Sequence, residues 1–174
     1  MTPKEFIKQY KPFALESEKK TGISHLFTLA QAALESGWGE RTFGNMLFGI
    51  KARPETPADK KQLLRTTEVL LSANVVFPKI ISIKKRADGK YIYTVLDWFR
   101  KYETQEECFT DHAQFFFKNK RYAKALEVKA DPYKFAIAVA QAGYATDPAY
   151  AQKLCRLISR LADLAIWRFD DLAI

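Results

Sequence analysis

The segment that decides the fold runs from Ser24 to Gly39 and reads Ser-His-Leu-Phe-Thr-Leu-Ala-Gln-Ala-Ala-Leu-Glu-Ser-Gly-Trp-Gly. Its apolar side chains recur at the three- and four-residue spacing of one helix face: Leu26, Leu29, Ala30, Ala33 and Leu34. The spacing predicts a helix over His25–Ser36, with Ser24 as its N-cap and the glycines around Trp38 as its stop. The opposite, polar face of this helix carries Thr28, Gln31 and Glu35.

Further helices are marked by their own start and stop residues. Thr2-Pro3-Lys4-Glu5 has the form of a capping box, which predicts a first helix that Gly22 ends. Helices resume after the middle of the chain, where Thr104 is the expected N-cap of the next one. Two more are opened by aspartate–proline pairs, Asp131-Pro132 and Asp147-Pro148.

The middle of the chain has a different pattern. Leu63–Phe77 is rich in Thr, Val and Leu without a helical stripe, and Ile80–Ile83 and Tyr91–Val95 flank Asp88-Gly89. Asp-Gly between β-forming runs is a strong hairpin signal, so we expect a small antiparallel β lobe over about 63–98. The resulting fold class is α+β, mainly α. We expect a single domain over 1–174 with the β lobe inserted between helical parts.

Composition and charge narrow the class of protein. The 174 residues are 48% hydrophobic, a proportion that excludes wholesale disorder. No stretch offers the roughly 18 uncharged apolar residues of a membrane-spanning helix, so none is expected. Lys and Arg number 28 against 20 Asp and Glu, a formal net charge of +8. This charge favours an anionic partner, which leaves nucleic acid, an acidic membrane surface and a wall polymer open.

Glu35 is the side chain best placed for acid chemistry. It lies in the last turn of its predicted helix, where the helix dipole opposes ionisation and raises the pKa of a carboxyl. Trp38 follows closely, and an indole beside a carboxyl excludes water and raises its pKa further. A carboxyl that stays protonated near neutrality can donate a proton to a glycosidic oxygen. The alternative is a solvated glutamate on a polar helix face.

Five segments follow one another along the chain: Ala32–Gly39, Gly44–Lys51, Thr66–Glu68, Phe99–Tyr102 and Gly143–Ala151. Together they resemble the glucosaminidase domain of glycoside hydrolase family 73, which includes bacterial autolysins and the hydrolase domain of flagellar rod-assembly proteins. The resemblance extends from about Phe6 to Leu161. It implies a lysozyme-like helical lobe and a β-hairpin lobe that form a cleft. It also implies cleavage of the N-acetylglucosaminyl-β-1,4-N-acetylmuramyl bond of peptidoglycan.

The resemblance assigns catalytic roles to individual residues. Glu35 matches the general acid, and Glu68 matches a second carboxylate that would activate water from the other side of the sugar. Alternatively, the 2-acetamido group of the substrate acts as the nucleophile, and Tyr144 orients it. Without the resemblance, Glu68 reads as an exposed strand residue and Tyr144 as a core tyrosine.

The same resemblance points to a substrate-binding set made of Trp38, Asn45 and Phe48, with Gln31 in line with Glu35 on the helix. Aromatic faces pack on pyranose rings, and amides hydrogen-bond the hydroxyl and acetamido groups of amino sugars. For Phe48 a place in the core is the alternative, and for Asn45 a turn.

Cys108 and His112 are four residues apart on one predicted helix, a spacing that could suggest a thiol nucleophile or half a metal site. The only other Cys and His, Cys155 and His25, lie far from this pair along the chain, and the four positions do not have the spacing of a zinc motif. We expect two buried thiols and no metal or organic cofactor. No phosphate loop or nucleic-acid module is present, so we expect no nucleic acid as partner. The partner that the resemblance implies is the glycan strands of peptidoglycan.

The sequence leaves other functions open. A lytic transglycosylase or muramidase on a similar scaffold is the nearest alternative to an endo-β-N-acetylglucosaminidase, and a non-catalytic wall-binding assembly module is another. Met1–Phe13 has no apolar signal segment, although the implied substrate lies outside the cytoplasm. We therefore expect action on the cell wall, periplasmic or extracellular. The protein is expected to be a phage or prophage lysin, to be carried on a larger machine, or to have lost a leader by trimming.

Overall fold

A computed structural model describes residues 1–166 of the protein. These residues form two compact units, a helical unit and a sheet unit. The helical unit contains Met1–Phe48 and the chain from Glu103 onward, and the sheet unit is Gly49–Tyr102. Residues 167–174, which belong to the predicted domain, lie outside the described residues.

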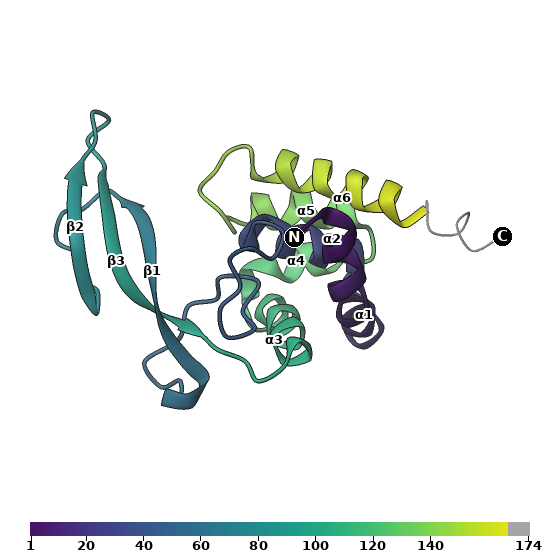
Figure 1. Ribbon diagram of the computed structural model, residues 1–174. Coiled ribbons are helices and arrows are strands. Elements are labelled where there is room, and N and C mark those ends of the chain that lie inside the picture. The colour runs from purple at the N-terminus through teal and green to yellow at the C-terminus, as the bar shows by residue number, and fades with distance from the viewer. Residues whose placement is uncertain (167–174) are drawn as a thin grey trace. The chain divides into compact units, whose positions relative to one another are not determined.

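The helical unit is built around α2 (His25–Ser36), which packs against helices from both ends of the chain. Helix α6 packs against α2 and α5, and α1 packs against α2 and α3 (Figure 1). The bounds of these helices are α1 Pro3–Thr21, α3 Gln105–Lys118, α4 Ala123–Leu126, α5 Pro132–Gln141 and α6 Tyr150–Ile166. Because α2 is covered from several directions, both its apolar and its polar faces are enclosed.

An aromatic cluster forms the core of this unit. Phe27 on α2 meets the rings of Phe116 on α3 and Phe135 on α5 in edge-on contacts, with centroids 5.8 and 4.5 Å away. Such contacts add to the apolar burial that drives folding. The predicted helical stripe of α2 is confirmed in part, since Leu29, Ala30 and Ala33 are buried. Leu26 and Leu34 remain partly exposed.

The predicted caps are confirmed at three helices. Thr2 and Glu5 complete a capping box, and the Thr104 hydroxyl accepts the Glu107 backbone N–H at 3.2 Å. Asp131 likewise accepts from two backbone N–H groups of α5. The prediction for Ser24 is wrong in one respect: it precedes α2, but its side chain makes no capping bond. The last helix begins at Tyr150 rather than at Asp147, whose carboxylate instead closes a turn with the Ala149 N–H.

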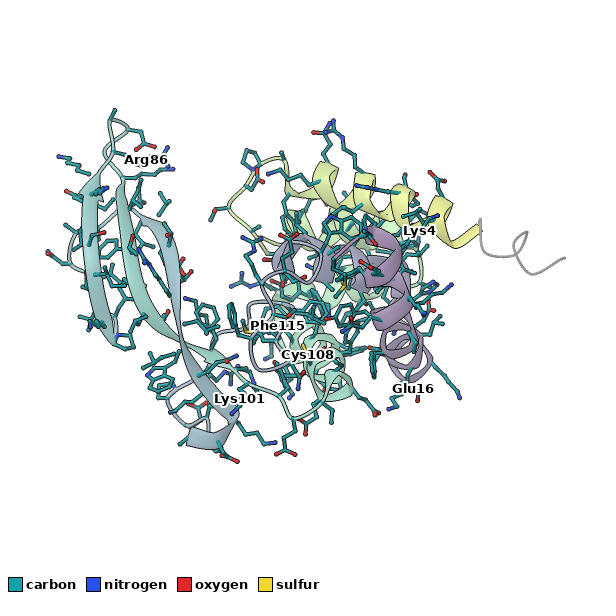
Figure 2. All side chains as sticks on the ribbon, viewed as in Figure 1. Lys4, Glu16, Arg86, Lys101, Cys108 and Phe115 are labelled. Atoms are coloured by element: carbon teal, nitrogen blue, oxygen red, sulfur yellow. The ribbon has the colours of Figure 1, made fainter. Side chains whose placement is uncertain are left out.

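The sheet unit confirms the predicted antiparallel β lobe. Within the described residues the sheet has three strands in the order β1-β3-β2, with β1 Lys61–Leu70, β2 Lys79–Lys85 and β3 Tyr91–Arg100. The predicted Asp88-Gly89 turn joins β2 to β3, and Figure 2 shows Arg86 at the tip of this hairpin. A register shift between Ile80 and Ser82 marks a bulge in β2. A short 3₁₀ helix, Ala58–Lys60, leads into β1.

The loop after β1 covers part of the sheet unit. Tyr93 on the central strand is fully buried, and its hydroxyl donates to the Ser72 carbonyl at 3.1 Å. Phe77 packs on the same ring with centroids 5.5 Å apart. The edge strand β2 has no such cover, and Lys79, Lys84 and Lys85 extend from it into solvent. The buried centre of this unit is therefore small. Several of its large apolar side chains are exposed, among them Leu71, Val76 and the isoleucines of β2.

Across residues 1–166, no helix combines the length and apolar character needed to cross a bilayer.

Candidate active site

The turn after α2 explains why the segment Glu35-Ser36-Gly37-Trp38-Gly39 has its composition. Gly37, Trp38 and Gly39 all have left-handed backbones, with φ of 59°, 58° and 82°. Glycine adopts this conformation freely, whereas for Trp38 it costs about 1–2 kcal/mol. The Ser36 hydroxyl holds the turn, because it donates to the Ala32 carbonyl and accepts the Gly39 N–H at 2.9 Å. The turn reverses the chain immediately after Glu35.

Glu35 is partly buried in the last turn of α2. Burial is the main reason that the pKa of its carboxyl is raised, because loss of water penalises the charged form. The Tyr150 hydroxyl and the charge of Arg41 act in the opposite direction and lower this pKa, but burial dominates. Glu35 therefore keeps its proton to higher pH than an ordinary glutamate. The polar face of α2 is not solvated, since Thr28 and Gln31 are both fully enclosed.

Side chains from three helices form a hydrogen-bonded chain that ends at Glu35. Nε2 of His112 on α3 lies 2.7 Å from Oε1 of Gln31 on α2, and Gln31 Nε2 donates to the Tyr150 hydroxyl at 2.8 Å. The Tyr150 hydroxyl in turn donates to Glu35 Oε1 at 3.4 Å. That last bond is long for an O–H···O pair.

Tyr144 lies in the loop between α5 and α6, beside this chain. Its ring stacks on those of Tyr150 and Phe116, with centroids 5.5 and 5.9 Å away. Burial raises the pKa of the Tyr144 phenol, and the charge of Glu35 raises it further. Tyr144 is therefore a neutral phenol near Glu35, able to donate a hydrogen bond.

The remaining predicted binding residues of the helical unit have clear packing partners. The Trp38 ring meets Phe6 edge-on at 5.5 Å and lies under the Arg160 guanidinium at 5.2 Å. Asn45 has a left-handed φ of 55°, and its amide donates to the Glu103 carbonyl at 2.9 Å and accepts from Gln105 at 3.1 Å. Asn45 thus connects its loop to the start of α3.

Phe48 takes the core position that the sequence left as its alternative. Its side chain is 3% exposed, and the ring stacks face to face on His112 with centroids 3.7 Å apart. Gln31 is 0% exposed and is bonded on both sides by His112 and Tyr150. Both side chains are therefore buried beneath Glu35 and Tyr150 and present no exposed face to a sugar.

Glu68 belongs to the sheet unit, on β1 opposite Tyr93 of β3. Its carboxylate lies 2.8 Å from the Lys51 ammonium, which also contacts Asp97 and sits 4.4 Å above the Phe99 ring. Glu68, Lys51 and Asp97 are all partly exposed to solvent. The structure thus brings Glu35, Gln31 and Tyr144 together in one unit, whereas Glu68 forms a separate charged cluster in the other.

Cys108 and His112 do not form a catalytic pair. Both are buried on α3, and Figure 2 shows Cys108 within the helical unit. Burial raises the pKa of the Cys108 thiol to about 12, so the nucleophilic thiolate is strongly disfavoured. Cys108 and Cys155 are both free, but the prediction of two buried thiols is wrong for Cys155, which is partly exposed. Among residues 1–166, no group of three or more His, Cys, Asp or Glu side chains is arranged to hold a metal ion.

Residues 11–163 match the glucosaminidase family, described as mannosyl-glycoprotein endo-beta-N-acetylglucosaminidase. The chain belongs to the glucosaminidase family. The observed helices and three-stranded sheet confirm the predicted fold class, a mainly helical α+β architecture.

Individual members of the glucosaminidase family are similar along most of the chain. Peptidoglycan hydrolase FlgJ of Vibrio parahaemolyticus is 32% identical over 169 residues, which cover 94% of this chain and 49% of that protein. Exo-glucosaminidase LytG of Bacillus subtilis is 34% identical over 142 residues, covering 76% of this chain and 42% of LytG. The chain thus spans about half the length of these relatives.

A solved member of the glucosaminidase family has the same architecture. The glycoside hydrolase domain of FlgJ from Salmonella typhimurium superposes with a TM-score of 0.72 at 28% identity. The superposition covers 99% of this chain and 96% of that domain.

Sequence reasoning missed several neighbours of the two carboxylates. Tyr150 has no predicted role, although it lies within one of the five family-like segments, Gly143–Ala151. His112 was considered only together with Cys108. Lys51 also lies inside a family-like segment, but no local pattern connects it with Glu68, because the two meet through tertiary packing.

Proposed function

We propose that this glucosaminidase domain is an endo-β-N-acetylglucosaminidase that cleaves the β-1,4 bond between N-acetylglucosamine and N-acetylmuramic acid in peptidoglycan, with Glu35 as general acid. The observation that carries the proposal is the burial of Glu35, which raises the pKa of its carboxyl in a chain of this family. The similarity to proteins named peptidoglycan hydrolase and exo-glucosaminidase supports the choice of substrate. The domain proposed is the whole chain, with the sheet unit inserted between helical parts.

In the proposed reaction, Glu35 gives its proton to the glycosidic oxygen while the bond from that oxygen to the anomeric carbon breaks. The bonding electrons stay on the leaving oxygen, and positive charge develops on the sugar ring. Glu35 becomes a carboxylate, and the Tyr150 hydroxyl is the donor that meets it. Tyr150 is suited to this because burial raises the pKa of its phenol, so the hydroxyl keeps its proton.

Two completions of the reaction follow from the residues present. In the first, Glu68 removes a proton from the water that attacks the anomeric carbon, and its partner Lys51 holds the carboxylate in place. In the second, the 2-acetamido oxygen of the substrate attacks the anomeric carbon, and the neutral Tyr144 hydroxyl orients that group. Water then opens the resulting ring. Neither route requires a metal or an organic cofactor.

Product analysis of purified murein tests the proposal. Wild-type protein should release fragments with N-acetylglucosamine at the reducing end, and Glu35→Gln should release almost none. Reducing-end N-acetylmuramic acid would instead identify a muramidase, and 1,6-anhydromuramyl ends a lytic transglycosylase. Binding to insoluble murein without release of sugar would identify a wall-binding module.

A second mode of attack, from the ends of glycan strands, is favoured by one observation. The relative that is 34% identical is named an exo-glucosaminidase. An endo-acting enzyme produces long fragments early in the digestion, whereas an exo-acting enzyme releases small sugars from the first minutes. The size distribution of early products therefore separates the two modes.

The proposed place of action follows from the substrate. Peptidoglycan lies outside the cytoplasm, so we propose that the protein acts on the cell wall, with glycan strands as its partner. The +8 net charge suits such a polymer, which carries peptide-stem carboxylates.

A further inference from the structure

His112 is a buried titratable residue that the proposed reaction does not use. It is 1% exposed, and its ring is held between Phe48, stacked at 3.7 Å, and Phe116, edge-on at 5.2 Å. Burial lowers the pKa of His112 to about 3, so the imidazole is neutral at any pH at which the protein is used. A neutral imidazole carries one N–H donor and one acceptor nitrogen.

The hydrogen bond to Gln31 fixes which nitrogen carries the proton. The amide oxygen of Gln31 can only accept, so Nε2 of His112 donates to it at 2.7 Å. The acceptor nitrogen, Nδ1, is then buried with no hydrogen-bond partner among the described residues. An unsatisfied buried group of this kind destabilises a fold, and an apolar side chain would avoid that cost. Packing alone therefore does not explain a histidine at this position.

The direction of the next bonds depends on how the Gln31 amide is turned. As it stands, its N–H donates to the Tyr150 oxygen at 2.8 Å, which leaves the Tyr150 hydroxyl proton directed to Glu35. With the amide reversed, its oxygen would accept the Tyr150 proton, and Glu35 would lose its donor. The His112 N–H opposes this reversal, because it would then face the N–H₂ of Gln31.

We propose that His112 and Gln31 are positioning residues that keep the Tyr150 hydroxyl directed to Glu35. They act through Tyr150 and do not touch the substrate. This inference rests on the proposed function of Glu35. It gives a positioning role to a histidine whose Nδ1 is buried without a hydrogen-bond partner among the described residues.

Two amide substitutions of His112 form a matched test. The amide nitrogen of glutamine is as many bonds from the backbone as Nε2 of histidine, so His112→Gln keeps a donor where Gln31 needs it. His112→Asn places an amide of the same polarity at the depth of Nδ1, where it does not reach Gln31. The two variants therefore differ in reach and not in the kind of group that they bury. Cys108→Ala, one turn earlier on α3, controls for loss of packing.

We expect His112→Asn to lower kcat on murein by about tenfold with KM unchanged, and His112→Gln to recover most of that loss. Cys108→Ala should keep wild-type kcat. In a Tyr150→Phe background, His112→Asn should cause no further loss, because the hydroxyl that it positions is already absent. If His112→Asn does not fold, Gln31→Met is measured in the same two backgrounds, and the same pattern is expected.

Wild-type kcat in His112→Asn, or an equal loss with and without the Tyr150 hydroxyl, would overturn the inference while the proposed function stands. A wild-type protein that releases no sugar, or an active Glu35→Gln variant, would instead overturn the proposed function and this inference with it.

Discussion

The helical unit and the sheet unit each present a glutamate, but they hold it by different means. Glu35 is held by burial and by neutral hydrogen bonds from Tyr150, Gln31 and His112. Glu68 is held by the charge of Lys51, in a cluster that solvent reaches. Burial favours the protonated form of the Glu35 carboxyl and outweighs the Tyr150 hydrogen bond, which acts in the opposite direction. The contrast matches the two roles proposed, an acid that gives a proton and a base that takes one.

The two environments also differ in rigidity. The rings of Phe48 and Phe116 fix His112 at the base of the site, and core packing resists displacement. An exposed ion pair such as Lys51–Glu68 contributes little stability and weakens with salt. Glu35 therefore lies beside a tightly packed core, whereas Glu68 is held by an exposed ion pair.

Removing each carboxylate is the strongest test of this contrast. Glu35→Gln should lower kcat by at least about a hundredfold, because the proton donor is lost. Glu68→Gln should cost about tenfold, since the acetamido group offers a second route to the same products. Release of reducing sugar from purified murein measures both, and circular dichroism verifies folding. Equal losses in the two variants would break the contrast.

Truncating one apolar residue in each unit tests the difference in packing. Phe48→Ala should lower the free energy of unfolding by about 3–5 kcal/mol, because it empties a filled core position beneath His112. Leu71→Ala in the sheet unit should change it by less than about 0.5 kcal/mol, since Leu71 is 81% exposed. Urea denaturation followed by fluorescence measures both. A small effect at Phe48 would show that the core beneath His112 is not tightly packed.

Two left-handed glycines allow a finer comparison. Gly89 in the hairpin has a φ of 82° and no atom within 4 Å of an added Cβ, so Gly89→Ala should cost about 1–2 kcal/mol of stability and leave activity unchanged. Gly37 has a φ of 59°, and an added Cβ would lie 3.3 Å from the Arg41 guanidinium. Gly37→Ala should therefore cost similar stability and also reduce activity. Thermal unfolding and murein digestion separate the two outcomes.

The smallest expected effect is a shift in pH dependence. The Tyr150 hydroxyl lowers the pKa of Glu35, so Tyr150→Phe should raise that pKa. A general acid loses activity as pH rises through its pKa, and the alkaline limb of the kcat profile should therefore move to higher pH. Tyr133→Phe, which removes an exposed hydroxyl bonded to Ser159, is the control and should leave the limb in place. A shift to lower pH would contradict the geometry.

Local signals made much of the fold predictable. Thr2, Thr104 and Asp131 bond the first turns of their helices as their spacing indicated, and Asp88-Gly89 closes the expected hairpin. Each of these features depends on residues that are neighbours in the sequence. The fold class could be predicted from little more than the order of these helices and strands.

The environment of Glu35 was less accessible to sequence reasoning, because its partners are distant along the chain. Tyr150 is 115 residues from Glu35, and His112 is 81 residues from Gln31. The periodicity of α2 indicated a polar face but not that α3 and α6 would cover it. The left-handed backbone of Trp38 was also unexpected, since bulky residues avoid this conformation.

The lysines of β2 have a consequence for handling the protein. An unprotected edge strand can recruit another molecule as an additional strand, and like charges along the edge discourage this. Lys79, Lys84 and Lys85 supply those charges on β2. Amine-reactive labelling or lysine acetylation would remove them, and self-association of the hairpin is the first change to look for in such a preparation.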